Sequence, residues 1–231
     1  MDFNFTGIAY TASVWILPVL IAITFHEAAH GWVAWRLGDF TAYNQGRITF
    51  NPLKHIDPFG TIILPGLLLL GSGGQMMFGF AKPVPVNFNA LRNPRRDMVL
   101  VALAGPLSNV LLAILATTLL HATLFLEGDA RNWVTINLLN AVKINLLLFV
   151  FNMLPLPPLD GGRVVVGLLP IPLAVKFSGL EQFGFFILLG ALFFLPYIGE
   201  KVGIDLNIFS WLVGEPTEYL MILFLTLFNL I

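Results

Sequence analysis

The stretch His26-Glu27-Ala28-Ala29-His30 decides what kind of molecule this chain forms. Residues four apart lie on one face of a helix, so both imidazoles can bind a single metal ion, and this spacing suits Zn2+. The glutamate between them is placed to transfer protons rather than to bind the metal. The motif therefore predicts a zinc hydrolase. The alternative is a metal-free histidine pair at a helix end, which would leave Glu27 without a partner in apolar surroundings.

The surroundings of this motif are those of a membrane protein. Residues 3–25 carry no charged side chain, and a helix over residues 10–36 would be about 40 Å long, enough to cross a bilayer. The chain is 57% hydrophobic and 11% charged, whereas soluble domains carry about 25% charged residues. It has no cysteine, so the ligands of a zinc site must be His, Asp or Glu. The net charge of -1 gives no indication of nucleic-acid binding.

Further apolar segments predict an all-α polytopic membrane protein with about five to six membrane segments. The segments are residues 98–126, 133–154, 182–199 and 206–231. We expect one membrane domain over residues 1–231, with a catalytic core at about 10–165, accessory C-terminal helices at about 180–231 and no cleavable signal peptide. Residues 46–52 have a strand-like core between turn formers, which predicts a short membrane-associated β-strand or hairpin after the first helix. A plain connecting loop is the alternative.

Residues 58–81 are uncharged, but glycines and prolines interrupt them. Basic residues flank this segment on both sides, and the positive-inside rule places both flanks in the cytoplasm. We therefore expect a re-entrant or surface-lying hairpin here rather than a crossing. With the N-terminus outside, His26, His30, Asn109 and Asp160 all fall toward the cytoplasmic side of a multi-pass protein in the cell (inner) membrane.

Two polar residues in later apolar segments are candidates for the same site. Asn109 follows Gly105 in an uncharged helix, where it could orient a ligand, steady an oxyanion or hold a substrate backbone. The alternative for Asn109 is a hydrogen bond that joins two helices. Asp160 follows a proline-rich break and precedes two glycines. Such an Asp-Gly pair often forms only a turn, but the histidine pair lacks a third protein ligand.

Five motifs in this order resemble those of the site-2 protease family of intramembrane zinc metalloproteases. They are the HEAAH motif at residues 26–30, NPLKHIDP at 51–58, AKPVPVN at 81–87, GPLSN at 105–109 and LDGGR at 159–163. The resemblance covers about residues 10–165 and is closest to the compact prokaryotic type without PDZ or CBS domains. It implies one Zn2+ per chain bound by His26, His30 and Asp160. It also implies Glu27 as the catalytic base and Asn109 in substrate or transition-state binding.

The function expected from these residues is zinc-dependent cleavage of transmembrane segments in membrane-protein substrates. The partners would be a transmembrane protein substrate and the lipid bilayer, whereas the oligomeric state stays open. One alternative is a transporter of metal ions or protons, because intramembrane ionisable residues serve that role too. An inverted repeat, typical of transporters, is not apparent in the sequence. The other alternative is a membrane-protein binder that does not cleave its partner.

Overall fold

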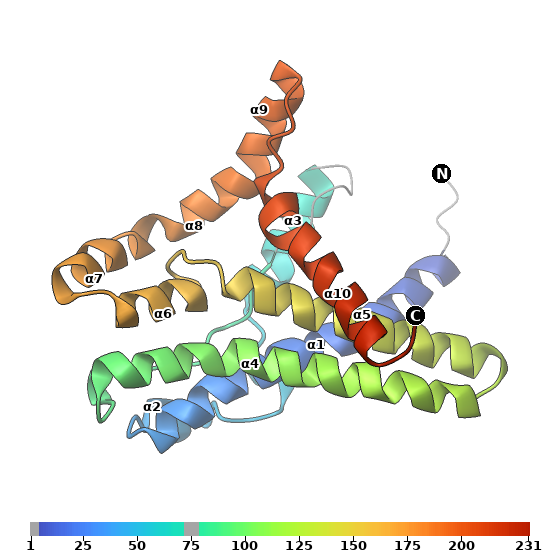
Figure 1. Cartoon of the computed structure of the whole chain (residues 1–231), viewed down its shortest axis with the longest axis horizontal. Coiled ribbons are helices and arrows are strands. Elements are labelled where there is room, and N and C mark those ends of the chain that lie inside the picture. Colours follow the sequence, from blue (N-terminus) through green and yellow to red (C-terminus); the bar gives the residue numbers. More distant parts are fainter. Residues whose placement is uncertain (1–4, 72–78) are drawn as a thin grey trace.

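The computed structural model describes residues 5–71 and 79–231, and every regular element within these ranges is a helix (Figure 1). The α-helices are α1 (Phe5–Arg36), α2 (Thr41–Asn44), α3 (Leu64–Gly71), α4 (Pro94–Leu120), α5 (Gly128–Asn152), α6 (Asp160–Leu168), α7 (Ile171–Ser178), α8 (Glu181–Leu189), α9 (Leu195–Val202) and α10 (Glu215–Leu227). Shorter helical turns are Pro52–Lys54, Phe88–Ala90 and His121–Phe125, of the 3-10 type, and Pro58–Ile63, Gly190–Phe194 and Ser210–Gly214, of the π type.

The body of the molecule is formed by α1, α4 and α5, which pack against one another along their lengths (Figure 1). Ala113 and Ala116 of α4 are buried against Val142 and Leu146 of α5. Small residues let two helix backbones approach closely in a bilayer, where packing rather than water exclusion joins helices. Side chains of α10 pack against the same cluster, so the C-terminal helix crosses the face that α4 and α5 share.

Four helical stretches among the described residues are long and apolar enough to cross a membrane. They are Ala9–Arg36, Pro94–Phe125, Gly128–Asn152 and Glu181–Val202. This confirms the predicted all-α polytopic class. The predicted number of five to six membrane segments is not confirmed, because the described part of the chain provides four by length and composition.

The predicted β-strand or hairpin after the first helix is wrong. Residues 46–51 form an irregular connection without strand structure. Their backbone groups bond locally instead of pairing with a second strand: the amide of Arg47 donates to Ala42 O (2.9 Å), and the amide of Asn51 donates to Thr49 Oγ1 (3.2 Å). The side chain of Asn51 then caps the helical turn that begins at Pro52. The backbone groups of a strand need hydrogen-bond partners on a neighbouring strand. Here local hydrogen bonds and a side-chain cap supply those partners instead.

The segment over residues 58–81 departs from the body and returns to the point where it began. The amide of Phe80 donates to Gly60 O (3.0 Å), and the Thr61 hydroxyl donates to Phe80 O (2.9 Å). The two described ends of the segment therefore meet, an arrangement that agrees with the expected hairpin. Residues 72–78 of this segment lie outside the described residues.

Candidate metal centre

His26 and His30 project from one face of α1 and are both almost fully buried. Their Nε2 atoms lie 3.0 Å apart. The motif was expected to bring the two imidazoles together, and the helix does so because four residues complete about one turn. Both residues belong to the candidate span Ala9–Arg36.

The other nitrogen of each imidazole is held by an acceptor, which fixes the tautomer. His26 Nδ1 lies 2.6 Å from Asn109 Oδ1, and His30 Nδ1 lies 2.7 Å from Val101 O. An amide oxygen and a carbonyl oxygen can only accept, so both Nδ1 atoms carry the hydrogen in the neutral rings. The Nε2 lone pairs are thereby left to converge on one point, the arrangement that metal-binding histidines need.

Asp160 arrives at this point as the first residue of α6, after a sharp turn over residues 153–159. The turn is tight enough to require the two glycines that follow Asp160. A Cβ atom at Gly161 would overlap the carbonyl groups of Met153 and Leu154, and one at Gly162 would overlap the backbone of Pro157. The Asp-Gly-Gly sequence therefore does more than form a turn, because it delivers a buried carboxylate to the imidazoles.

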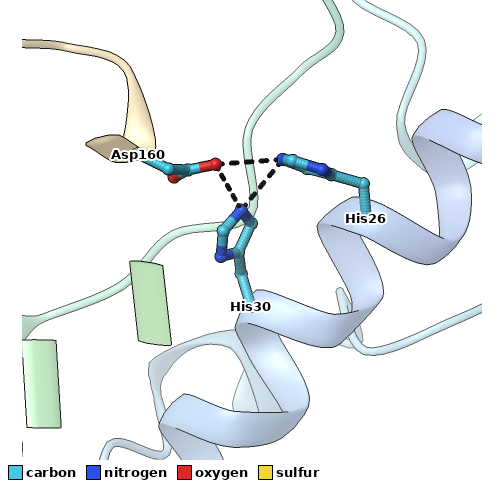
Figure 2. Close-up of side chains that lie close together, drawn as sticks. All are labelled: His26, His30 and Asp160. Atoms are coloured by element: carbon cyan, nitrogen blue, oxygen red, sulfur yellow. Dashed lines mark hydrogen bonds and ion pairs between the residues drawn. The ribbon is translucent and has the colours of Figure 1, made fainter. Parts of the chain in front are cut away.

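The three side chains form a triangle of ligand atoms (Figure 2). Asp160 Oδ2 lies 3.2 Å from His26 Nε2 and 3.3 Å from His30 Nε2. Four ligands around Zn2+ at about 2.0–2.1 Å are about 3.3 Å from one another, so these atoms match one face of a tetrahedron. The fourth corner would remain open to water or substrate, as in catalytic zinc sites.

The chemistry of the donor set also fits a cation. Asp160 Oδ2 is buried and has no hydrogen-bond partner, and two imidazole lone pairs face it. Burial raises the pKa of the Asp160 carboxyl group, but His30 and His26 in their protonated form lower it by more through their charge and hydrogen bonds, so in the metal-free protein the pKa lies below its ordinary value. Asp160 starts α6, outside the four candidate spans. Its carboxylate is ionised at neutral pH, the form that binds metal ions.

Gly105 of α4 forms the wall directly behind the two imidazoles. A Cβ atom built there would lie 2.6 Å from His26 Nε2 and closer still to His30 Nε2. The absence of a side chain at this position is what lets α4 approach the ligands of α1. The GPLSN motif thus contributes Gly105 and Asn109 to the same centre, one by its lack of a side chain and the other by its amide.

Glu27 points to the same cavity as the three ligands. The cavity has a volume of about 420 Å³ and is lined by residues of α1, α4, α5, α6, α8 and the extended segment over residues 79–88. Oε2 of Glu27 accepts a hydrogen bond from the amide of Val84 (2.6 Å). A carboxylate beside a tetrahedral metal site can take a proton from water and return it to a leaving group.

Asn109 lies at the site, but its amide is directed at protein groups. It is fully buried, and while its oxygen accepts from His26, its Nδ2 donates to Ala22 O (3.2 Å) and to Asn145 Oδ1 (2.8 Å). These contacts suit the orientation of a metal ligand, one of the roles expected for Asn109. Asn145 of α5 thereby joins the centre through its hydrogen bond with Asn109.

Two other polar residues of the NPLKHIDP motif lie apart from the ligands. His55 is buried and bonds through Nε2 to Thr49 O (3.0 Å), and the Asp57 carboxylate accepts from the amide of Gly60 (2.7 Å). Both side chains therefore shape the connection between α1 and α4.

The backbone amide of Val84 contacts Glu27, and the sequence could not indicate this contact, because every residue except proline carries an amide hydrogen.

Comparison with known proteins agrees with this geometry. Residues 14–127 match the family model described as peptidase family M50. Three relatives carry the description "Putative zinc metalloprotease". YwhC of Bacillus subtilis is 41% identical over 78% of this chain and 80% of its own length. Rip2 of Mycolicibacterium smegmatis is 34% identical over 62% of this chain and 52% of its own length, and MJ0611 of Methanocaldococcus jannaschii is 32% identical over 70% and 73%. No solved structure gives a significant match.

The chain belongs to peptidase family M50, the site-2 protease family of zinc metalloproteases. It is accordingly a metalloendopeptidase whose cofactor is Zn2+, and its apolar helices make it a multi-pass membrane protein. The resemblance inferred from the motifs is thereby confirmed.

Proposed function

We propose that this chain is an intramembrane endopeptidase that cleaves transmembrane segments of membrane proteins. One observation carries the proposal: a complete zinc-ligand triangle, with Glu27 beside it, is built on a helix that is apolar enough to span the bilayer. Counting from Arg36, His26 lies about 15 Å inside the end of that helix. A substrate bond that reaches this depth belongs to a membrane segment rather than to a soluble loop.

Each site residue has a distinct role in the proposal. His26, His30 and Asp160 hold Zn2+, which when bound polarises a carbonyl group and acidifies water. Glu27 acts as the general base that accepts the proton of the attacking water, and it then donates that proton to the leaving amine. Asn109 keeps the imidazole of His26 in the tautomer that presents Nε2 to the metal.

The cavity favours an unwound, largely apolar peptide. Most of its lining side chains are apolar, among them Val84, Phe151, Phe185 and Leu188, and it lies beside membrane helices. A helix buries its own backbone groups, so a substrate helix must open locally before its carbonyl can reach the metal. We further propose that the site faces the cytoplasm from the cell (inner) membrane, because the basic residues between α1 and α4 favour that side.

The experiment pairs metal content with cleavage. Wild type, Asp160→Ala and Glu27→Gln are purified in detergent, bound zinc is quantified, and each is incubated with a panel of single-span membrane peptides. We expect about one zinc and cleavage in wild type, loss of both in Asp160→Ala, and retained zinc without cleavage in Glu27→Gln.

Each of the other outcomes would overturn one part of the proposed function. Cleavage by Glu27→Gln at the wild-type rate would remove the general-base role. Stoichiometric zinc in wild type without cleavage of any peptide in the panel would count against proteolysis of membrane segments and favour a binder that does not cleave. Zinc flux through reconstituted vesicles would favour a transporter instead.

A further inference from the structure

An extended segment, residues 80–87, crosses the metal centre and is fixed along its whole length. We call it the strap. At its start the amide of Lys82 donates to His55 O (2.9 Å), and at its end the amide of Asn87 donates to Asp39 Oδ2 (2.7 Å). Asp39 is completely buried, and its other carboxylate oxygen accepts from the amide of Thr41 at the start of α2.

Arg47 holds the middle of the strap. This buried side chain donates through Nη2 to the carbonyl oxygens of Lys82 (2.9 Å) and Pro83 (3.2 Å). A guanidinium group is planar and permanently charged, so two carbonyl groups bound to it are held in a defined geometry. No carboxylate pairs with Arg47 among the described residues, so the strap carbonyls are the partners that compensate the burial of this charge.

The next residue of the strap contacts the proposed catalytic base. The amide of Val84 donates to Glu27 Oε2 (2.6 Å), and no other hydrogen bond of this carboxylate lies within the described part of the chain. Val84 is buried above Gly31 of α1, where an added Cβ atom would lie 2.9 Å from Val84 Cγ1. The strap is thus seated on α1, one turn beyond Glu27.

We propose that Arg47 and Asp39 are positioning residues, which hold the strap so that the Val84 amide fixes the orientation of the Glu27 carboxylate. The inference rests on the general-base role proposed for Glu27. A glutamate has a flexible side chain with several rotamers, and one short hydrogen bond to a rigid backbone amide selects among them. Oε2 is then occupied by the strap, and Oε1 is left for the proton of the attacking water.

A proline at position 84 tests the amide itself. Val84→Pro removes the hydrogen that Glu27 accepts, in a segment that already has prolines on both sides, and Val84→Ala is the control that shortens the same side chain but keeps the amide. We expect Val84→Pro to keep one zinc and a nearly unchanged KM while kcat falls about 100-fold, the scale of a small misplacement in a catalytic site. Val84→Ala keeps the amide, so its kcat should fall far less than that of Val84→Pro, while the shorter side chain in the cavity lining raises KM.

The side chain that holds the strap is tested separately. Arg47→Met should lower kcat with zinc retained, and Arg47→Lys, which keeps a donor, should recover part of that loss. Arg96→Met removes an exposed cation of α4 that makes no hydrogen bond or ion pair within the described part of the chain, so it should leave kcat unchanged.

A readout independent of cleavage is amide hydrogen exchange. Pro83 and Pro85 have no amide hydrogen, so a peptide over residues 83–87 reports only Val84, Val86 and Asn87. We expect Glu27→Ala to speed exchange at Val84 while Asn87, whose amide donates to Asp39, stays protected, and Arg47→Met to speed exchange along the strap.

The outcomes separate this inference from the proposed function. If wild type binds zinc but cleaves nothing, the proposed function fails, and the exchange data alone decide whether the strap holds Glu27. Unchanged exchange at Val84 in Glu27→Ala would overturn the inference whether or not wild type cleaves. So would a wild-type kcat in Val84→Pro, or loss of zinc in both Val84→Pro and Val84→Ala, which would make the strap a support of the metal ligands.

Discussion

Gly105 shows how a residue without a side chain can shape a metal centre. Its Cα hydrogen faces the two imidazoles of α1, and the space that a methyl group would fill is taken by their Nε2 atoms. Close approach of two membrane helices at a small residue usually serves packing alone. In this chain the same contact also closes the back of the proposed zinc site.

Substitution of Gly105 by alanine should therefore impair metal binding before it impairs folding. The added methyl group would displace both imidazoles, and overpacking of this kind costs about 1–3 kcal/mol. We expect zinc affinity to fall by about 5- to 150-fold, measured by competition with a chelator of known affinity. Gly190→Ala is the matched control, because a Cβ atom there meets nothing within 4 Å. Equal zinc affinity in Gly105→Ala and wild type would contradict this account.

The hydrogen bonds that join His26 to Asn109 and Asn109 to Asn145 lead to a second prediction about single residues. Groups that orient a metal ligand typically contribute 10–100-fold to metal affinity. Asn109→Ala should lower zinc affinity by about that range, and Asn145→Ala by less, because Asn109 also donates to Ala22 O. Isothermal titration of the zinc-free proteins would measure both. If Asn109→Ala bound zinc normally but lost cleavage, a direct substrate or transition-state role would be favoured instead.

At the scale of elements, α8 rests directly on the turn that carries Asp160. A Cβ atom at Gly184 would overlap Pro157 O, so the helix lies against the backbone of the turn. Its neighbour Phe185 contacts Phe80 of the strap edge-to-face, with ring centroids 6.2 Å apart. The helix therefore touches both the zinc-ligand turn and the strap, which links the C-terminal helices to the centre.

Gly184→Val should lift α8 from this turn. We expect a lower thermal midpoint and weaker zinc binding, because two methyl groups cannot fit against Pro157 without a shift worth about 1–3 kcal/mol. Gly190→Val, on the same run of helix, meets open space and should change neither quantity. Glu181→Gln should have little effect as well, since its 3.7 Å pair with Arg163 is well exposed and such pairs contribute at most about 1 kcal/mol.

At the scale of the whole molecule, the proposed zinc site joins segments that are far apart in the chain. Two of its candidate ligands come from α1 and the third from the start of α6, with α4 and α5 between them in the sequence. A ligand that binds only the folded state stabilises it, by about 2.7 kcal/mol when its concentration is 100 times its Kd. The metal is therefore expected to stabilise the packing of the bundle as well as to serve catalysis.

Removal of zinc should lower the thermal midpoint of wild type, and added zinc should restore it. Asp160→Ala should show a smaller shift or none, because its remaining two ligands bind zinc weakly. The measurement is thermal unfolding in detergent with and without a chelator. A chelator effect of equal size in wild type and Asp160→Ala would place the stabilising metal somewhere other than this centre.

The sequence by itself determined the class of the protein and pointed to the candidate ligands that the structure brings together. Apolar runs fix where helices cross, because a bilayer leaves backbone groups no other partner than their own helix. The spacing of His26 and His30 fixes their shared face, because the helical repeat is local. The motifs also pointed to Asp160 and Asn109, both of which lie at the centre.

Only the tertiary structure decided how the remaining groups are used. The strand-like pattern of residues 46–52 lacked a partner strand and became an irregular connection, an outcome that depends on what lies beside it. The amide of Val84 donates to Glu27, and Arg47 donates to a carbonyl group of the strap. Gly105 leaves room for two imidazoles because it has no side chain. Backbone donors and close approaches leave no residue-specific trace in the sequence, because they arise from the packing of segments that the chain keeps far apart.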